Sequence, residues 1–362
     1  MAGLQIHPRP NRERSVGLVR PGLTMTQMPT VELDPRTAYD FLMSGCNDCG
    51  ELEDLLPEDR GWLQESRAAV QTEVGDTETA RACVGFVSEV SRLLVVRPEI
   101  KTARHVVAAV DQLSDAELLE CLFGELLESA EVAGFARKAL NGDAEAYAAL
   151  GDQLEHWKGH SVMPETLAEL APGARQVLHA WLPRFEQAEV RVGRMLDRDV
   201  AGRHADDAIT DPLGFVEKAT NGIRMVPEQK TRRIVLAPSY FGRPYNSLIK
   251  VGEITLVCYP IADSALGAGG RAAPPVATLR LYRALGDESR LRILRLLAER
   301  DRYLTELATE LDLSKPTVSH HLAQLRSAGL VTMTEQGNLT YYTLRRDRAE
   351  QAGPELSAFL AR

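Results

Sequence analysis

The sequence lacks any run of eighteen or more apolar residues, which is the length a helix needs to cross a bilayer. It also lacks, near its start, the apolar core and small-residue cleavage site of a secretory leader. We therefore expect a protein that acts in the cytoplasm and not in a membrane. Residues 1–30 show little periodicity and predict a disordered tail, in which Met25 or Met28 is an alternative start.

Cysteine is scarce, and its count is odd. Five cysteines do not make a disulfide framework, so we predict reduced thiols. Cys46 and Cys49 form a CxxC that suits half a zinc site or a thiol switch, but no second pair follows, which favours a structural or incidental role. His156 and His160 stand four residues apart without a third ligand, so we interpret them as a polar face. No metal site is predicted.

Catalytic signatures are missing as well. The chain has no dinucleotide-binding glycine fingerprint, no nucleophile elbow and no metal-binding triad, so we predict no catalytic residue, no cofactor and no enzyme. The glycines of 267–270 lack the Lys-Ser/Thr ending of a phosphate loop and indicate a linker.

Aromatic residues make up only 6% of the chain. Most aromatic side chains belong to cores, yet a few line small-molecule pockets. Among the residues open to either interpretation, the last three cluster in a Gly/Pro-rich loop and are the first place to look for a pocket: Trp62, Trp157, Trp181, Tyr240, Phe241 and Tyr245.

Periodicity predicts a mostly α fold with small β elements. Apolar residues recur at three- and four-residue spacing from about 35 to 204, and β-branched runs predict a small sheet near 223–261. We assign 31–263 to a large α+β regulatory or sensor domain, 264–276 to a linker rich in glycine and proline, and 277–362 to a second domain.

The charge is divided unevenly between these parts. The whole chain has a net charge of −9, but residues 280–362 hold 13 basic and 11 acidic residues, against 29 basic and 40 acidic in the rest. Because an acidic surface repels phosphate, only the C-terminal part is suited to approach a partner that carries phosphate groups.

Residues 287–328 carry three helical patterns. Asp287 predicts an N-cap for a helix over Glu288–Glu299, with Leu291, Leu294 and Leu297 facing inward. A second helix over Glu306–Leu311 precedes a tight turn. Ser314 then predicts the cap of a third helix.

This third helix has an apolar side and a polar side. Val318, Leu322, Leu325 and Ala328 predict the buried side, and Gly329 suits its end. Two alternating strands around Gly337-Asn338 follow, so the order is that of a winged helix-turn-helix, which places one helix in the DNA major groove. We expect DNA contacts from Ser314, Lys315, Thr317, Ser319, His320, His321, Gln324, Gln336 and Asn338, although His321 is equally suited to pack beside the core.

The segments DESRLRILRLLAE, ELATELDLSKPTVSHHLAQLRSAGLV and YYTL together resemble the ArsR-type (arsenic-repressor-like) transcriptional regulators. The resemblance covers about 70 residues and implies a homodimer, joined through its first and last helices, that binds an inverted repeat in double-stranded DNA. By this resemblance we expect Leu279–Leu285 and the C-terminal tail GPELSAFLAR to supply those helices. The acidic unit resembles an uncharacterised domain that precedes such heads in bacterial regulators.

Two departures from that family bear on function. Tyr303-Leu304-Thr305 stands where metal-sensing members carry cysteines, so we predict no metal sensing there, and residues 332–336 of the wing lack lysine and arginine. Our hypothesis is a repressor whose N-terminal domain senses an unknown signal, with a small-molecule effector as one form of it. The alternatives are an enzyme or a protein-docking module fused to an autoregulatory DNA-binding head.

Overall fold

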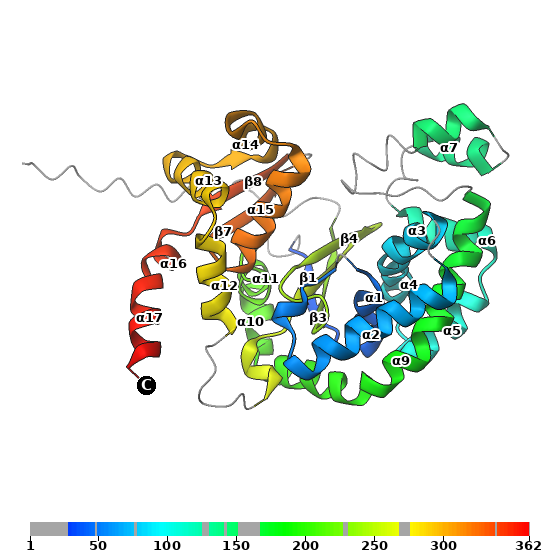
Figure 1. The fold of residues 1–362 in the computed structure, drawn as a ribbon, viewed down its shortest axis with the longest axis horizontal. Coiled ribbons are helices and arrows are strands. Elements are labelled where there is room, and N and C mark those ends of the chain that lie inside the picture. The colour runs from blue at the N-terminus through cyan, green and yellow to red at the C-terminus, as the bar shows by residue number, and fades with distance from the viewer. Residues whose placement is uncertain are drawn as a thin grey trace, which may run out of the picture.

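The computed structural model describes residues 28–47, 49–75, 78–124, 130–140, 143–150, 167–226, 231–267, 276–336 and 339–361. The predicted fold class is confirmed, because the described chain is mostly helical with two small sheets (Figure 1). We call residues 28–267 the N-terminal unit and residues 276–361 the head. Within the described residues, no helix combines the length and the apolar character that crossing a bilayer requires.

Helices form most of the N-terminal unit, and residues 144–150 are helical as well. The long α9 is its centre, since α1, α2, α3, α5 and α6 all pack against it. The helices with printed bounds are α1 (Thr37–Gly45), α2 (Pro57–Val74), α3 (Glu78–Phe86), α4 (Ser91–Val96), α5 (Ala103–Asp111), α6 (Asp115–Phe123), α7 (Ala130–Leu140), α9 (Leu167–Ala201), α10 (Ala205–Thr210) and α11 (Pro212–Ala219), with short 3₁₀ helices η2 (Leu52–Asp54), η3 (Val87–Val90) and η5 (Asp263–Leu266).

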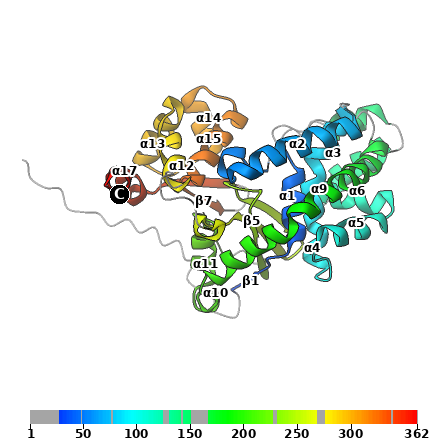
Figure 2. The ribbon, with the colours of Figure 1, turned by 60° about the horizontal axis from the view of Figure 1, so that its bottom comes forward.

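One sheet belongs to the N-terminal unit. Its strands are β1 (Thr30–Leu33), β3 (Arg233–Ser239), β4 (Ser247–Val251) and β5 (Ile254–Pro260), in the order β1-β3-β5-β4. β3 pairs in parallel with both β1 and β5, whereas β4 pairs antiparallel with β5. In Figures 1 and 2 this sheet lies between the helices on one side and the head on the other.

Both faces of this sheet are buried, each in a different core. Successive side chains of a strand point to opposite faces. Val235 and Ala237 of β3 therefore join the core of the N-terminal helices, while Ile234 and Leu236 join a second core. That second core contains α11 and the apolar side chains of the head, so the head and the N-terminal unit share one hydrophobic core.

The head contains α12 (Val276–Leu285), α13 (Glu288–Glu299), β6 (Arg302–Tyr303), α14 (Leu304–Leu311), α15 (Lys315–Ser327), β7 (Val331–Gln336), β8 (Leu339–Leu344), α16 (Arg346–Glu350) and α17 (Ala352–Leu360). β7 and β8 form the antiparallel wing, and β6 extends it beside β8. The short β2 (Ile223–Arg224) of the N-terminal unit adds a fourth strand in parallel with β7.

The strand assignments differ from the expected small sheet near 223–261 in two respects. Thr30, at the end of the predicted tail, begins β1 and joins the N-terminal sheet. Residues 223–224 pair with the wing of the head instead of with β3. Both differences involve partners far away in sequence, and apolar alternation reports that a strand exists without naming its partner.

Polar contacts also join the head to the N-terminal unit. Asp54 is 2% exposed and accepts a hydrogen bond of 2.9 Å from Arg280 of α12. Asp263 accepts a hydrogen bond of 3.0 Å from the backbone N–H of Ala277, and it also pairs with the buried Arg243. Because a buried carboxylate without a partner is costly, these pairs hold α12 at a defined place beside the N-terminal unit.

Candidate nucleic-acid interface

Local signals build the turn between α14 and α15. Asp312 adopts a left-handed conformation with φ of 55°, and the backbone N–H of Leu313 returns to Ala308. Ser314 caps α15 by accepting a hydrogen bond of 3.3 Å from the backbone N–H of Thr317. Pro316 occupies the first turn, where its missing N–H has no partner to lose. The predicted cap is confirmed.

The buried side of α15 is also as predicted. Val318, Leu322 and Leu325 are at most 1% exposed, and Ala328 is buried beside them. Gly329 follows the helix at φ of 74°, a backbone conformation that glycine adopts without strain. These contacts fix the rotation of α15 about its axis, and therefore which side chains face solvent.

The packing of α13 corrects one part of the expected pattern. Asp287 caps the helix and Leu297 is buried, but Leu291 is 49% exposed and Ile293 is fully buried. Ile293 and Leu297 are four residues apart, so the inner stripe begins two residues later than expected. The contacts of α13 with α14, α15 and β8 select that stripe.

Four predicted contact residues form an exposed polar surface on the first half of α15. We call Lys315, Thr317, Ser319 and His320 the recognition ridge, and all four are exposed. Ser314, just before them, is also exposed, although its hydroxyl lies 2.7 Å from that of Thr317. The ridge offers one cation with hydroxyl and imidazole groups, which suit phosphates and base edges.

His321 turns away from this ridge. Its side chain is only 14% exposed, and its Nδ1 lies 3.9 Å from a carboxylate oxygen of Asp287 at the start of α13. Burial lowers the pKa of His321 from its ordinary value, and the nearby Asp287 opposes that shift. The geometry matches the packing interpretation that the sequence had left open.

Gln324 is half-buried and already engaged. Its side-chain carbonyl accepts a hydrogen bond from Arg290, and its amide nitrogen lies 3.0 Å from Nε2 of His320. Gln324 also lies near enough to Tyr245, of the N-terminal unit, to oppose the rise in the pKa of that phenol which burial causes. Sequence reasoning did not single out Arg290, because only the tertiary fold brings α13 beside this part of α15.

The wing is described in part. β7 and β8 pair from Val331 with Leu344 to Gln336 with Leu339. Asn338 lies outside the described residues, as does the side chain of Gln336. After β8, Arg345 donates a hydrogen bond of 3.3 Å to Asn221 of the N-terminal unit.

Comparisons with known proteins agree with this geometry. Residues 287–333 match the family described as bacterial regulatory protein, arsR family. The chain is 38% identical over 72 residues to the uncharacterized HTH-type transcriptional regulator MJ1325 of Methanocaldococcus jannaschii, a match that covers 20% of this chain and 81% of that protein. The chain belongs to the arsR family. The expected winged helix-turn-helix head of a transcriptional regulator is thereby confirmed.

Other relatives are similar over shorter shares of their length. The arsenical resistance operon repressor of Escherichia coli is 42% identical over 67 residues, which cover 18% of this chain and 57% of that protein. The HTH-type transcriptional regulator KmtR of Mycobacterium tuberculosis is 36% identical over 73 residues, 20% of this chain and 56% of that protein. The chain spans little more than half the length of these two relatives.

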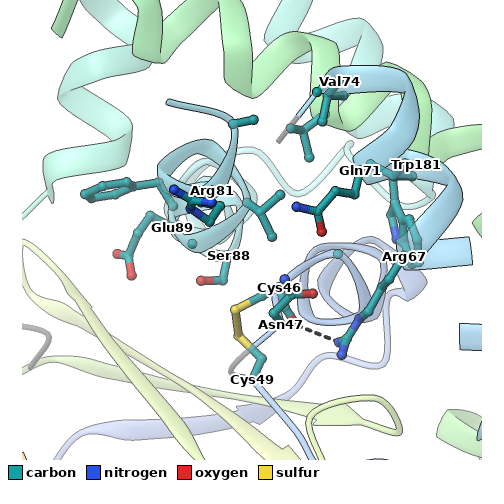
Figure 3. A pocket seen from close by; sticks show the side chains of 18 of the residues that line it. Cys46, Asn47, Cys49, Arg67, Gln71, Val74, Arg81, Ser88, Glu89 and Trp181 are labelled. Atoms are coloured by element: carbon teal, nitrogen blue, oxygen red, sulfur yellow. Dashed lines mark hydrogen bonds between the residues drawn. A yellow bond between two sulfur atoms is a disulfide. The ribbon is translucent and has the colours of Figure 1, made fainter. Parts of the chain in front are cut away.

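Away from the arsR-type head, the N-terminal unit contains a cavity of about 450 Å³ (Figure 3). Its walls come from the end of α1, from α2, α3 and α9, and from the start of β4. Its lining combines apolar side chains such as Val70 and Val177 with polar ones such as Arg67 and Glu89. Asn47 and Arg81 are exposed while lining the cavity, so it opens to solvent.

The two cysteines of the CxxC form part of this wall. A disulfide joins Cys46 to Cys49, with their Cα atoms 5.5 Å apart. The expectation of reduced thiols is therefore wrong for this pair. Cys46 ends α1 and the chain reverses after it, which brings two residues three apart within the distance that a disulfide spans. Cys83, Cys121 and Cys258 are free.

The aromatic residues divide between core, cavity and head. Tyr240 and Phe241 are buried in the core of the N-terminal helices, and Trp181 lines the cavity. Tyr245 lies near Gln324 of the head. None of the three aromatic residues of the Gly/Pro-rich loop, where a pocket was expected, is among the described residues that line the cavity. Trp157, His156, His160 and the glycines 268–270 lie outside the described residues. The described residues include no group of three or more potential metal ligands.

Proposed function

We propose that this chain is a homodimeric repressor that binds an inverted-repeat operator in double-stranded DNA. The observation that carries the proposal is the recognition ridge, a polar surface on the first half of α15 whose rotation is fixed by the buried residues behind it. A helix held this way presents its N-terminal residues to the major groove.

The residues of the ridge have different roles in this proposal. Lys315 and Ser314 bind phosphates, because a cation and a helix N-terminus attract anions without reading sequence. Thr317, Ser319 and His320 read base edges, which their hydroxyl and imidazole groups suit.

The remaining predicted contacts have more limited roles. Gln324 reads a base only when it leaves Arg290 and Tyr245, and His321 supports α15 against α13. We assign contacts with DNA phosphate groups to Gln336 and Asn338 of the wing, because the wing of this fold type lies beside the groove that the helix enters.

Exposed leucines support the homodimer. Leu279 of α12, Leu356 and Leu360 of α17 are 38%, 38% and 73% exposed. α12 and α17 pack together, with the Tyr282 hydroxyl donating a hydrogen bond of 2.6 Å to the Ala352 carbonyl. A second copy that covers this face removes the leucines from water and places two ridges about one helical turn, ~34 Å, apart.

The test is selection of binding sites from randomised duplexes by the full chain at low salt. The enriched sequence should be an inverted repeat, with half-sites about one helical turn apart. No enrichment, or a single unrepeated half-site, contradicts the proposal. Leu360→Asp should shift the chain to monomer in sedimentation and weaken operator binding. Val190→Asp is the control and should do neither, because Val190 is a similarly exposed apolar residue that lies on α9 and not on α12 or α17.

We also propose that the N-terminal unit senses a signal through the cavity, whose size is that of small-molecule sites in other proteins. Thermal-shift screening separates this role from the alternatives. A metabolite that raises the melting temperature supports sensing. A co-purifying protein without such a metabolite supports a docking module, and turnover of a bound compound supports an enzyme. Since a repressor acts at the chromosome, its proposed location is the cytoplasm.

A further inference from the structure

The cavity wall holds the only disulfide among the described residues, and its two cysteines differ in exposure. Cys46 is 4% exposed, whereas Cys49 is half-buried, and both line the open cavity. Figure 3 shows the two sulfur atoms bonded at one end of the cavity, with Arg67 hydrogen-bonded to the backbone carbonyl of Cys46 at 2.7 Å. Cys49 is therefore the more accessible residue of the pair.

The residues after Cys49 are pressed against a buried loop. A side chain at Gly50 would lie 2.1 Å from the carbonyl oxygen of Phe241, so the backbone has no room to shift toward that loop. The backbone N–H of Glu51 donates a hydrogen bond of 2.8 Å to the carbonyl of Arg243. Arg243, which is 1% exposed, donates in return to the carbonyl of Asp54 at 3.1 Å. The segment from the disulfide to Asp54 therefore moves as one piece with this loop.

Two side chains connect that segment to the head. The carboxylate of Glu51 accepts a hydrogen bond from Tyr245, whose hydroxyl also interacts with Gln324 of α15. Asp54 pairs with Arg280 of α12. One route from the segment after Cys49 to α15 therefore runs through Glu51 and Tyr245, and a second runs through Asp54 and Arg280 to α12, which packs against α15.

We propose that Cys46 and Cys49 are a reversible thiol–disulfide exchange site, and that its redox state controls the hold of the N-terminal unit on α15. The reductant is a dithiol, either a small molecule or a protein. The regulatory output rests on the proposed function, whereas the exchange chemistry does not.

The exchange balances within the pair and the dithiol. A thiolate of the dithiol attacks Sγ of Cys49, the bond between the two cysteine sulfurs breaks, and Cys46 leaves as a thiolate that takes up a proton. The second thiol of the dithiol then attacks the mixed disulfide and releases Cys49, which is protonated in turn. Two electrons and two protons pass to the pair, and the dithiol becomes a disulfide.

Reduction frees the turn after α1 and loosens the contact of Glu51 with Tyr245. Gln324 then keeps its hydrogen bond from Arg290 but loses the hold of the N-terminal unit, so it leaves for the groove more readily and the reduced protein binds the operator more tightly. The expected gain is roughly fivefold, which is the factor that one hydrogen bond contributes.

The three free cysteines do not interfere with thiol alkylation of the native protein. Burial raises the pKa of Cys121 to about 11 and that of Cys83 to about 12, and it also raises the pKa of Cys258. At pH 7.5 these three thiols are neutral and react slowly, because the thiolate is the nucleophile.

In the experiment, the full chain is reduced with dithiothreitol and alkylated in the native state, and its intact mass is measured. Two added alkyl groups on Cys46 and Cys49 after reduction, and none before it, are the expected result. A pair that stays oxidised in the folded protein overturns the exchange site. Cys121→Ser is the matched control and should give the same two groups.

Operator affinity and amide exchange of α15 are then measured in both redox states. The wild type should bind more tightly after reduction, and the double variant Cys46→Ser/Cys49→Ser should bind like the reduced wild type in either condition. Glu51→Gln leaves the sulfurs in place but weakens one of the two links, so its affinity should differ less between the redox states than that of the wild type.

Equal affinity of the two redox states of the wild type overturns the coupling. If no state binds DNA, the proposed function has failed, and amide exchange still decides the inference: faster exchange of α15 after reduction supports it, and unchanged exchange overturns it.

Discussion

The two faces of the N-terminal sheet carry different partners. On one face, Leu256 and Cys258 of β5 pack with the N-terminal helices, and on the other, Val257 and Tyr259 pack in the core that includes the head. The head is therefore built onto the sheet and is not a tethered appendage. The comparison teaches that a change near α1 and η2 has a packed route to α15.

The largest expected effect is on stability, and it comes from a substitution on the face of the sheet that packs against the head. Tyr259 is fully buried and donates a hydrogen bond of 2.8 Å to Asp199. The guanidinium carbon of Arg203 lies 4.5 Å from the centroid of the Tyr259 ring. Tyr259→Ala should lower the free energy of unfolding by about 3–5 kcal/mol, because it leaves a large cavity. Urea unfolding followed by circular dichroism measures the loss.

The same variant tests whether the two units unfold together. Limited proteolysis should show the head losing protection along with the N-terminal unit. Tyr341→Ala, in the half-exposed wing, is the control and should cost less. Independent unfolding of the head, unaffected by Tyr259→Ala, contradicts a shared core.

An intermediate effect is expected on the exposed side of α15, which lies outside the shared core. Lys315→Ala should weaken binding to every DNA sequence and flatten its salt dependence, since it removes one phosphate contact. His320→Ala should cost about 1–3 kcal/mol on the preferred sequence and relax the preference at one base pair. Binding titrations at several salt concentrations measure both.

Lys138→Ala on α7 removes the same charge far from the ridge and should leave binding unchanged. Equal losses from Lys315→Ala and His320→Ala on all sequences would reject the division between phosphate contact and base reading.

The smallest effect concerns His321, which lies between α15 and the start of α13. Burial lowers its pKa below the ordinary value of 6.5, against the influence of Asp287 and together with that of Arg290 and His320. As the pH falls through 6.5, the unfolded chain takes up a proton before the folded chain does, so stability decreases until the folded-state pKa is passed. His321→Gln should remove this slope from the pH dependence of thermal unfolding between pH 7 and pH 5. A slope unchanged by the substitution places its origin elsewhere.

Local signals predicted the head well. The caps at Asp287 and Ser314 and the burial of Val318 and Leu322 depend on residues within four positions of each other, so a single sequence contains them. The stripe of α13 was misplaced toward Leu291, because three leucines at regular spacing do not reveal which side another helix covers.

The N-terminal unit was predicted less completely, because its function depends on distant partners. Helices and strands were recognisable, but the pairing of β1 with β3 and of β2 with β7 joins residues up to about two hundred positions apart. The cavity likewise combines four separate helices, and no stretch of sequence marks it.

The sequence alone determined the helix-turn-helix, its caps and the polar character of its exposed side, since each follows from the spacing of neighbouring residues. Only the tertiary structure decided that the head shares a core with the sheet, that Gln324 meets Arg290 and Tyr245, and that Cys46 and Cys49 close a cavity wall. These contacts are set by burying both faces of one sheet, and that requirement acts on the whole chain at once.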